Sequence, residues 1–239
     1  MAKTIQFIVT CEHGGNRIPP RFRHLFHDRE QLLESHRGYD AGALAIAKLL
    51  ARTLSAPLII STTSRLLIDL NRSIGHPKLY FETVRQTPLA MRNDILEHYY
   101  LPYRNAAESA IAKAIAHGSK VIHISSHSFT PELNGKIRHA DIGLLYDPAR
   151  KAEAVLCARW QAAFKSHSPN LTIRRNYPYT GKSDGFTAYL RRRFEPESYL
   201  GIELEINQKH VGKGKQHWRS LKNTVVSALL EALKSITLR

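Results

Sequence analysis

The chain has 239 residues, 43% of them hydrophobic and 23% charged, a composition that excludes a disordered chain and suits one folded domain over residues 1–239. Lysine and arginine number 35 against 20 aspartate and glutamate, so the formal net charge of +15 favours anionic ligands. No apolar run is as long as a membrane span, and Thr4 leads straight into a strand-like run, so we expect a cytoplasmic protein without a signal peptide or a membrane partner.

The first predicted unit is a strand, a helix and a second strand. Residues 5–9 are mostly apolar, which predicts a buried strand. Residues 41–54 repeat leucine and alanine at helical spacing, and Asp40 precedes them as a candidate N-cap. Residues 57–61 are again strand-like, so the segment forms a βαβ-like unit.

Two polar segments follow predicted strands, and both carry histidine. The loop after the first strand contains His13 and Asn16 beside a pair of glycines. The β-branched run at 120–125 follows a predicted helix at 103–117 and leads into His127. Ligands of α/β proteins bind at the carboxyl ends of strands, so both segments are candidate ligand-bearing loops.

The segment from residue 64 to 73 places an apolar run among charged and amide side chains. Asp69 and Arg72 are explained equally well as a surface ion pair of little energetic value. Alternatively, Arg65, Asn71 and Arg72 form a site for a carboxylate, which a guanidinium binds in bidentate fashion. The residues alone leave both interpretations open.

The second half of the chain continues the alternation of strands and helices. Residues 199–208 alternate strictly, so Glu203 and Glu205 share one face. This pattern fits either an edge strand with a solvated face or a strand that aims a carboxylate into a site. Other predicted segments are strands at 141–146 and 171–175, a helix after Asp147, a polar loop at 176–185 containing Tyr179, and a terminal helix at about 219–236.

The side chains at these strand ends are the ones that a metal-assisted amide hydrolase uses. His13 and His127 supply imidazole for a divalent ion, and Glu205 supplies a carboxylate base for water. Arginines supply positive charge for an anionic substrate. Neither a Walker loop nor a GxGxxG motif occurs, so nucleotide-binding functions lack their usual signature.

Five stretches in order resemble the N-formylglutamate amidohydrolase family. The resemblance implies an α/β fold, a three-layer α/β/α sandwich around a mixed sheet like that of the zinc carboxypeptidases. It also implies hydrolysis of the N-acyl amide of a small acidic amino acid such as N-formyl-L-glutamate, with zinc as cofactor. The stretches are residues 11–19, 64–72, 127–131, 178–181 and 202–208.

The resemblance also implies roles for individual residues. His13 and His127 match metal ligands, and Glu205 matches the carboxylate that moves the proton, with Glu203 as the alternative. Arg65 would polarise the scissile carbonyl, while Asn71, Arg72 and Tyr179 would bind the substrate. Asn16 occupies the position of a third metal ligand that is glutamate in the zinc group. An amide is a poorer zinc ligand than a carboxylate, so metal affinity should fall unless Glu12, Asp40 or Asp69 substitutes.

Two alternatives follow from the same residues. One is a hydrolase that acts on a peptide or another amide, because loops and not the fold set specificity. The other is a non-catalytic protein that binds anions or nucleic acid through a degenerate site. The basic residues are dispersed and not interleaved with aromatic ones, which argues against nucleic acid as the partner.

Overall fold

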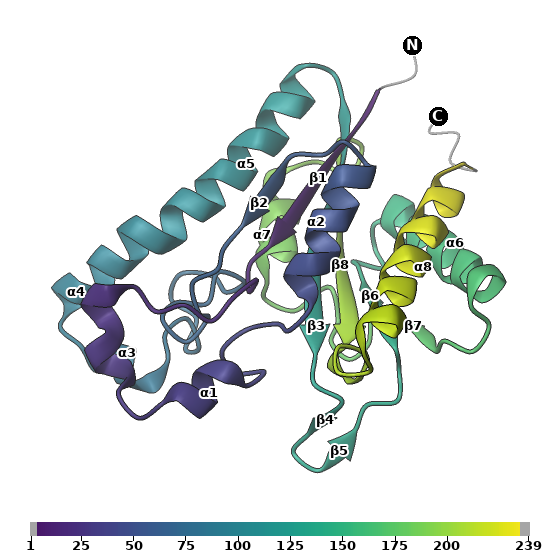
Figure 1. The fold of residues 1–239 in the computed structure, drawn as a ribbon. Helices are drawn as coiled ribbons and strands as arrows, with labels where there is room; N and C mark the ends of the chain where they lie inside the picture. The colour runs from purple at the N-terminus through teal and green to yellow at the C-terminus, as the bar shows by residue number, and fades with distance from the viewer. Residues whose placement is uncertain (1–3, 235–239) are drawn as a thin grey trace.

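The structure is a computed structural model, and it describes residues 4–234. Its centre is a six-stranded mixed sheet in the order β2-β1-β3-β8-β6-β7 (Figure 1). Strands β2, β1, β3 and β8 are parallel to one another, whereas β6 runs antiparallel to β8 and parallel to β7. The strands are β1 (Ile5–Cys11), β2 (Leu58–Ile60), β3 (Lys120–Phe129), β6 (Ile142–Leu145), β7 (Ile173–Arg175) and β8 (Tyr199–Asn207).

Helices cover both faces of the sheet and bury two separate hydrophobic clusters. One cluster lies under α2 (Ala43–Thr53), α6 (Lys151–His167) and α8 (Lys215–Lys234). The other lies under α5 (Leu101–Ala116) and α7 (Phe186–Arg193). This arrangement confirms the predicted α/β/α sandwich around a mixed sheet.

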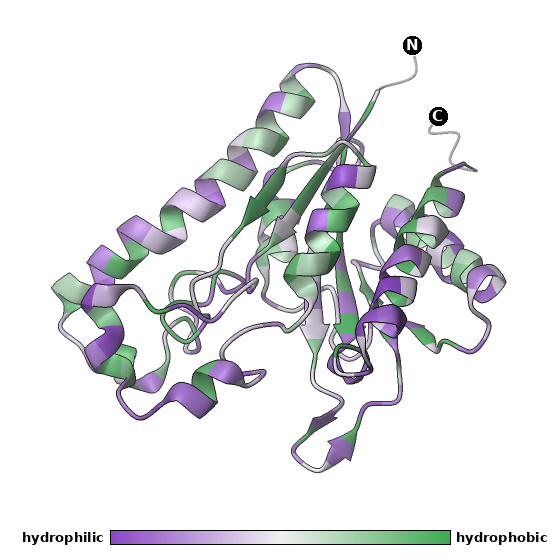
Figure 2. Ribbon diagram, in the orientation of Figure 1, coloured by the Kyte–Doolittle hydropathy of each residue, from purple (hydrophilic) through white to green (hydrophobic). Residues whose placement is uncertain are grey.

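Burial of apolar side chains explains why the strands occupy the middle layer. Ile122 and Ile124 of β3 and Ile202 of β8 are fully buried against the first cluster. Trp160 of α6 is also fully buried, and its indole Nε1 donates to the Val225 carbonyl at 3.3 Å. Figure 2 shows β1 as almost wholly hydrophobic, whereas the helices that cover the sheet are mixed. Such amphipathic helices have one face for the core and one for solvent.

Short elements connect the layers beyond the carboxyl ends of the parallel strands. In Figure 1, β1, β3 and β8 run toward the lower part of the view, where α1 and the β4-β5 hairpin lie. The short elements are η1 (Pro20–Phe26), α1 (Glu30–Glu34), α3 (Glu82–Arg85), α4 (Leu89–Ile95), the π-helical η2 (Leu96–Tyr100), β4 (Glu132–Leu133), β5 (Lys136–Ile137) and η3 (Gln208–His210). Among residues 4–234, no helix is long and apolar enough to cross a membrane.

Two sequence predictions near the strand ends are wrong. β3 continues to Phe129, so His127 lies within the strand and not in a loop, because pairing with β8 continues as far as the end of that strand. Asp40 does not cap α2. Gly42 takes the N-cap position with φ 85°, and the Asp40 carboxylate instead accepts from His127.

Other segments differ from prediction in extent or in position. β8 lies between β3 and β6 and is buried along its whole length, so the edge-strand interpretation is wrong. Helix α7 had no periodic signal in its sequence because it has only eight residues, three of them arginines at its end. The terminal helix α8 begins at Lys215, four residues before the predicted start, and residues 235 and 236 of that prediction lie outside the described part of the chain.

Candidate active site

The parallel strands bring functional side chains from distant parts of the chain to one edge of the sheet. His13 follows the end of β1, and His127 lies near the end of β3. In the β3-β8 pair, His127 is in register with Glu205, and Ser125 is in register with Glu203. Residues in register on neighbouring strands project to the same face, so these side chains meet on the side that carries α5.

His13, Asp40 and His127 form a buried cluster that is suited to a metal ion. Each residue offers one ligand atom, and the three atoms lie within 4.8 Å of one another. Asp40 Oδ2 is 2.8 Å from His127 Nδ1 and 3.4 Å from His13 Nδ1. Two imidazoles and a carboxylate are the donor set of a catalytic zinc site with one open position.

A further carboxylate lies next to Nε2 of each imidazole, on the side away from Asp40. Asp69 Oδ1 lies 2.7 Å from His13 Nε2, and Glu12 Oε2 lies 3.0 Å from His127 Nε2. Protein metal sites use this arrangement to hold the far ring nitrogen as a donor, so that Nδ1 of each ring would be available to coordinate an ion. The outer carboxylates therefore favour a metal site over a simple network of ion pairs.

Glu12 is itself fixed by neighbouring hydroxyl groups. The Ser125 hydroxyl donates to Glu12 Oε2 at 2.6 Å, and the Tyr103 hydroxyl donates to Oε1 at 2.8 Å. The side chain is fully buried. Burial favours the neutral acid, but the hydrogen bond from His127 outweighs it and holds the pKa of Glu12 well below its usual range. Glu12 is thus a fixed negative charge behind His127.

The same balance favours the ionised forms of Asp40, Asp69 and His127. Burial opposes charge at Asp40 and Asp69, but the nearby His13 and Arg65 hold the pKa of both carboxyls below the usual range. Burial lowers the pKa of His127, but its hydrogen bonds to Asp40 and Glu12 raise it well above the ordinary value. A metal that binds Nδ1 therefore displaces a proton from His127.

Glu205 differs from the other carboxylates because one of its oxygens is free. Oε2 is buried and accepts no hydrogen bond within residues 4–234. Burial, reinforced by the negative charges of Asp40 and Glu203, raises the pKa of Glu205 to about 8. The other candidate base, Glu203, accepts a hydrogen bond from the Thr187 hydroxyl through Oε1. The unpartnered carboxyl beside the cluster is the one suited to moving a proton.

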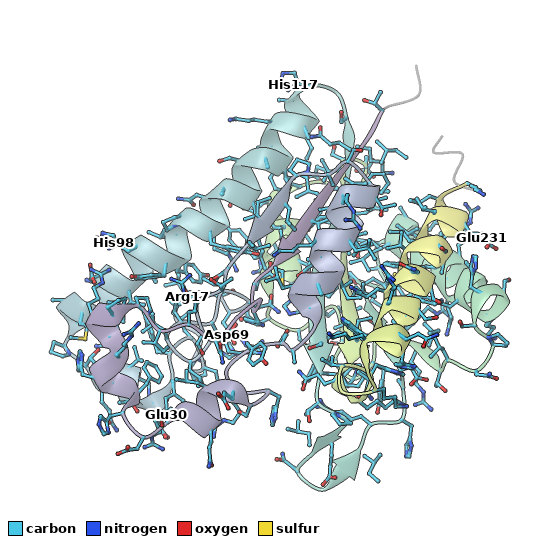
Figure 3. All side chains as sticks on the ribbon, in the orientation of Figure 1. Arg17, Glu30, Asp69, His98, His117 and Glu231 are labelled. Atoms are coloured by element: carbon cyan, nitrogen blue, oxygen red, sulfur yellow. The ribbon has the colours of Figure 1, made fainter. Side chains whose placement is uncertain are left out.

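A cavity of about 880 Å³ opens over these groups. Arg65 lines it and is held by two carboxylates, with Nη1 3.3 Å from Asp40 Oδ1 and Nη2 2.7 Å from Asp69 Oδ2. Figure 3 labels Asp69 below the end of β1, on the side toward which the parallel strands run. Arg65 is therefore fixed at the wall of the cavity, next to the His13 cluster.

The predicted substrate-binding residues also line the cavity. Asn71 Oδ1 accepts from the Phe186 amide at 2.6 Å. Arg72 Nη1 donates to the Asp184 carbonyl at 2.5 Å, and its buried Nε has no partner within the described residues. Tyr179 is 44% exposed at the edge of the cavity.

Asn16 is the predicted site residue that the structure does not bring to the others. It is half-buried and does not line the cavity, whereas Asp40 lies between the two histidines. Asp40 was among the sequence-level substitutes for the missing glutamate, but its position before a helix gave capping as a sufficient explanation. The roles of Glu12 and Asp69 behind the imidazoles had no sequence signal beyond their proximity to His13 and Arg65.

Residues 181–185 have the Gly-x-Ser-x-Gly spacing of a serine-hydrolase nucleophile elbow. Such an elbow places its serine between a strand and a helix, within reach of an imidazole base. Here Ser183 lies in a loop, and its hydroxyl is 3.1 Å from that of Thr180. Within residues 4–234 no histidine hydrogen-bonds to Ser183, so the spacing does not form a catalytic triad.

Comparison with known proteins agrees with this geometry. The family model for N-formylglutamate amidohydrolase matches residues 5–211. The chain belongs to the N-formylglutamate amidohydrolase family. The match includes His13, Asp40, His127 and Glu205, and membership supports hydrolysis of an amide. No curated protein sequence matches the chain significantly.

Solved structures share the fold. A gene product of Agrobacterium tumefaciens is 29% identical, with a TM-score of 0.83 over 98% of this chain and 92% of that one. An N-formylglutamate amidohydrolase from Ralstonia eutropha is 17% identical, with a TM-score of 0.71 over 98% of this chain and 96% of that one. The second likeness is one of fold alone.

Proposed function

We propose that this protein is a zinc-dependent amidohydrolase that removes the formyl group from N-formyl-L-glutamate or a closely related N-acylated acidic amino acid. The observation that carries the proposal is the buried cluster of His13, Asp40 and His127 beside Glu205 and its free carboxyl oxygen. Family membership supports the reaction class.

The donor set fits zinc. Nδ1 of His13, Nδ1 of His127 and Oδ2 of Asp40 would hold the ion, since these atoms converge and the far nitrogen of each ring already faces a carboxylate. A bound zinc ion acts as a Lewis acid on a carbonyl oxygen and lowers the pKa of a coordinated water.

The protein's own residues account for the proton transfers. In its ionised form, Glu205 accepts a proton through its free Oε2 from the water that attacks the formyl carbon, and a cation held by His13, Asp40 and His127 would lower the pKa of Glu205 and favour that form. When the carbon–nitrogen bond breaks, Glu205 returns this proton to the leaving nitrogen, and formate and glutamate are released. Arg65 carries a fixed positive charge at the same wall, which stabilises the negative oxygen of the tetrahedral intermediate. Arg65 is prepositioned for this role because two carboxylates hold it before substrate binds.

The substrate's carboxylates are assigned to the neighbouring polar groups. Arg72 has a buried Nε without a partner, and Asn71 has an amide nitrogen that no hydrogen bond from the described residues engages. Tyr179 lies at the edge of the same cavity. The net charge of +15 favours the approach of a dianionic substrate to the protein.

A direct assay tests this proposal. Purified protein loaded with Zn²⁺ should release formate from N-formyl-L-glutamate, and Glu205→Gln should lower kcat by roughly 10² to 10⁴-fold while the fold is retained. Glu231→Gln, on the exposed side of α8, is a matched control that should retain activity. Absence of turnover on a panel of N-acylated acidic amino acids, or full activity of Glu205→Gln, would contradict the proposal.

A further inference from the structure

The cavity has a buried reactive end and an exposed outer end. His13, Asp40, His127 and Glu205 line its inner end, and each is at most 5% exposed. Exposed side chains of the 36–37 and 76–85 segments line the same cavity. A substrate whose acyl carbon reaches the cluster therefore has its remaining atoms directed toward the outer end.

The outer end carries three basic side chains without ion-pair partners in the described part of the chain. Arg37, Lys78 and Arg85 line it, and none of the three forms an ion pair within residues 4–234. The acidic Glu82 and Asp184 line the same cavity and offset part of this charge. We call Arg37, Lys78 and Arg85 the outer cationic wall.

Two members of the outer cationic wall, Arg37 and Arg85, contact other parts of the protein. Arg37 lies over the ring of Phe81, 5.4 Å from its centroid, and Phe81 stacks on the buried Phe26 at 6.4 Å. Arg85 Nη1 is 3.4 Å from the Pro77 carbonyl. These three cations outnumber the neighbouring Glu82, so the wall would favour an anionic group of a ligand.

N-formylglutamate is small compared with this cavity. A cavity of about 880 Å³ is at the upper end of the range for drug-sized ligands, roughly 300–1,000 Å³. The formyl group adds no atoms beyond its carbonyl, so a formylated substrate can extend only through a carboxyl group of its amino acid. An amide at that carboxyl would extend the substrate away from the buried cluster.

We propose that the outer cationic wall is a second anion subsite, and that the preferred substrates are N-acylated acidic peptides whose second residue carries a carboxylate. This inference rests on the proposed deformylase function and names its substrate class. Exposed ion pairs are weak individually, so the gain in kcat/KM from the wall is expected to be roughly three- to tenfold, mainly in KM.

Two matched substrates test the inference. N-formyl-L-glutamyl-L-glutamate and N-formyl-L-glutamyl-L-glutamine have the same shape and differ in one negative charge. Wild-type protein should have a kcat/KM three- to tenfold higher for the first, and the preference should shrink as salt is raised. In the triple variant R37Q/K78Q/R85Q the ratio should fall to about one.

A second triple variant controls for net charge. K151Q/K165Q/K215Q removes three positive charges from α6 and α8, away from the cavity, and should keep the wild-type ratio. Equal kcat/KM for the two substrates in wild type, or a loss of preference in this control as well, would overturn the subsite.

A binding measurement separates this inference from the proposed function. The peptides Glu-Glu and Glu-Gln are titrated into wild type and R37Q/K78Q/R85Q by calorimetry, which needs no turnover. Tighter binding of Glu-Glu that disappears in the triple variant supports the subsite even if no formylated substrate is cleaved, which would overturn only the deformylase function. Turnover of N-formyl-L-glutamate with equal binding of both peptides overturns only the subsite.

Discussion

Glu12→Gln isolates the role of the outer carboxylate behind His127. The substitution keeps the shape of the side chain and removes the negative charge that faces His127 Nε2 at 3.0 Å. Outer carboxylates of this kind change metal affinity by roughly 10- to 100-fold when they are replaced. The expected loss is therefore about 1.4–2.8 kcal/mol of zinc-binding free energy.

The assay is a competition between the protein and a chromophoric zinc chelator at fixed pH. Tyr103→Phe is the matched control, because it removes one hydrogen bond to Glu12, at 2.8 Å, and keeps the carboxylate. This control should lose less affinity, in line with about 0.5–1.5 kcal/mol for one hydrogen bond. Circular dichroism and thermal unfolding establish that both variants are folded.

The proposed role of Glu12 in zinc binding is refuted if folded Glu12→Gln binds zinc as tightly as wild type, within about twofold. In that case Glu12 would not orient His127, or His127 would not be a ligand. A loss of zinc affinity of the same size in Tyr103→Phe would also contradict it, because the carboxylate charge would then not be the deciding feature.

Three further predictions concern other parts of the molecule. Arg65→Lys keeps the charge but cannot span two carboxylates, so kcat should fall on the order of 10²-fold with zinc content unchanged; unchanged kcat would exclude a role for the guanidinium geometry. Trp160→Ala opens a cavity in the fully buried core and should lower the free energy of unfolding by about 3–5 kcal/mol in urea titrations. A loss below about 1 kcal/mol would mean that neighbouring side chains fill the space left by the indole. Burial opposes ionisation of Asp141, but hydrogen bonds from His210 and Lys209 hold its pKa below the usual range. The stability that the Asp141 carboxylate contributes is therefore present above about pH 4 and is lost as the pH falls further. Unfolding of Asp141→Asn measured from pH 5 to pH 2 should therefore show a weaker loss of stability than wild type, and parallel pH profiles would contradict this assignment.

The sequence predicted the parts of the fold that depend on local pattern. Apolar or alternating segments located every strand of the central sheet. Strand β3 continues past its predicted end as far as Phe129. The strict alternation at 199–208 placed Glu203 and Glu205 on one face, and the register with β3 puts that face beside His127. The strand ends indicated where the candidate site lies, because the residues that follow parallel strands lie at one edge of the sheet.

The rest of the site depends on contacts between distant residues. Asp40 is 87 positions from His127, and nothing near it in the chain distinguishes a ligand from a helix cap. Its carboxylate faces the histidines because Gly42, at φ 85°, takes the capping position and turns the chain. The Ser126 and Ser128 hydroxyls then tie β3 to the carbonyls that precede and begin α2. Such tertiary hydrogen bonds have no periodic signature.

The sequence also does not show which charged residues have ion-pair partners in the fold. The formal charge of +15 favoured anionic ligands in general. It did not separate arginines with structural partners, such as Arg191 with the buried Glu153, from the unpaired Arg37 and Arg85 at the cavity. Only the packing of the chain makes that distinction, because ion pairs depend on the position of both partners.

X-ray absorption spectroscopy of the zinc-loaded protein tests the proposed metal site most directly. The proposed site predicts two imidazole nitrogens at about 2.0–2.1 Å from zinc together with carboxylate oxygen. It also predicts one imidazole fewer in His127→Ala and in His13→Ala. A wild-type spectrum without imidazole scattering, or one that neither substitution changes, would contradict the assignment of His13, Asp40 and His127 as the zinc ligands.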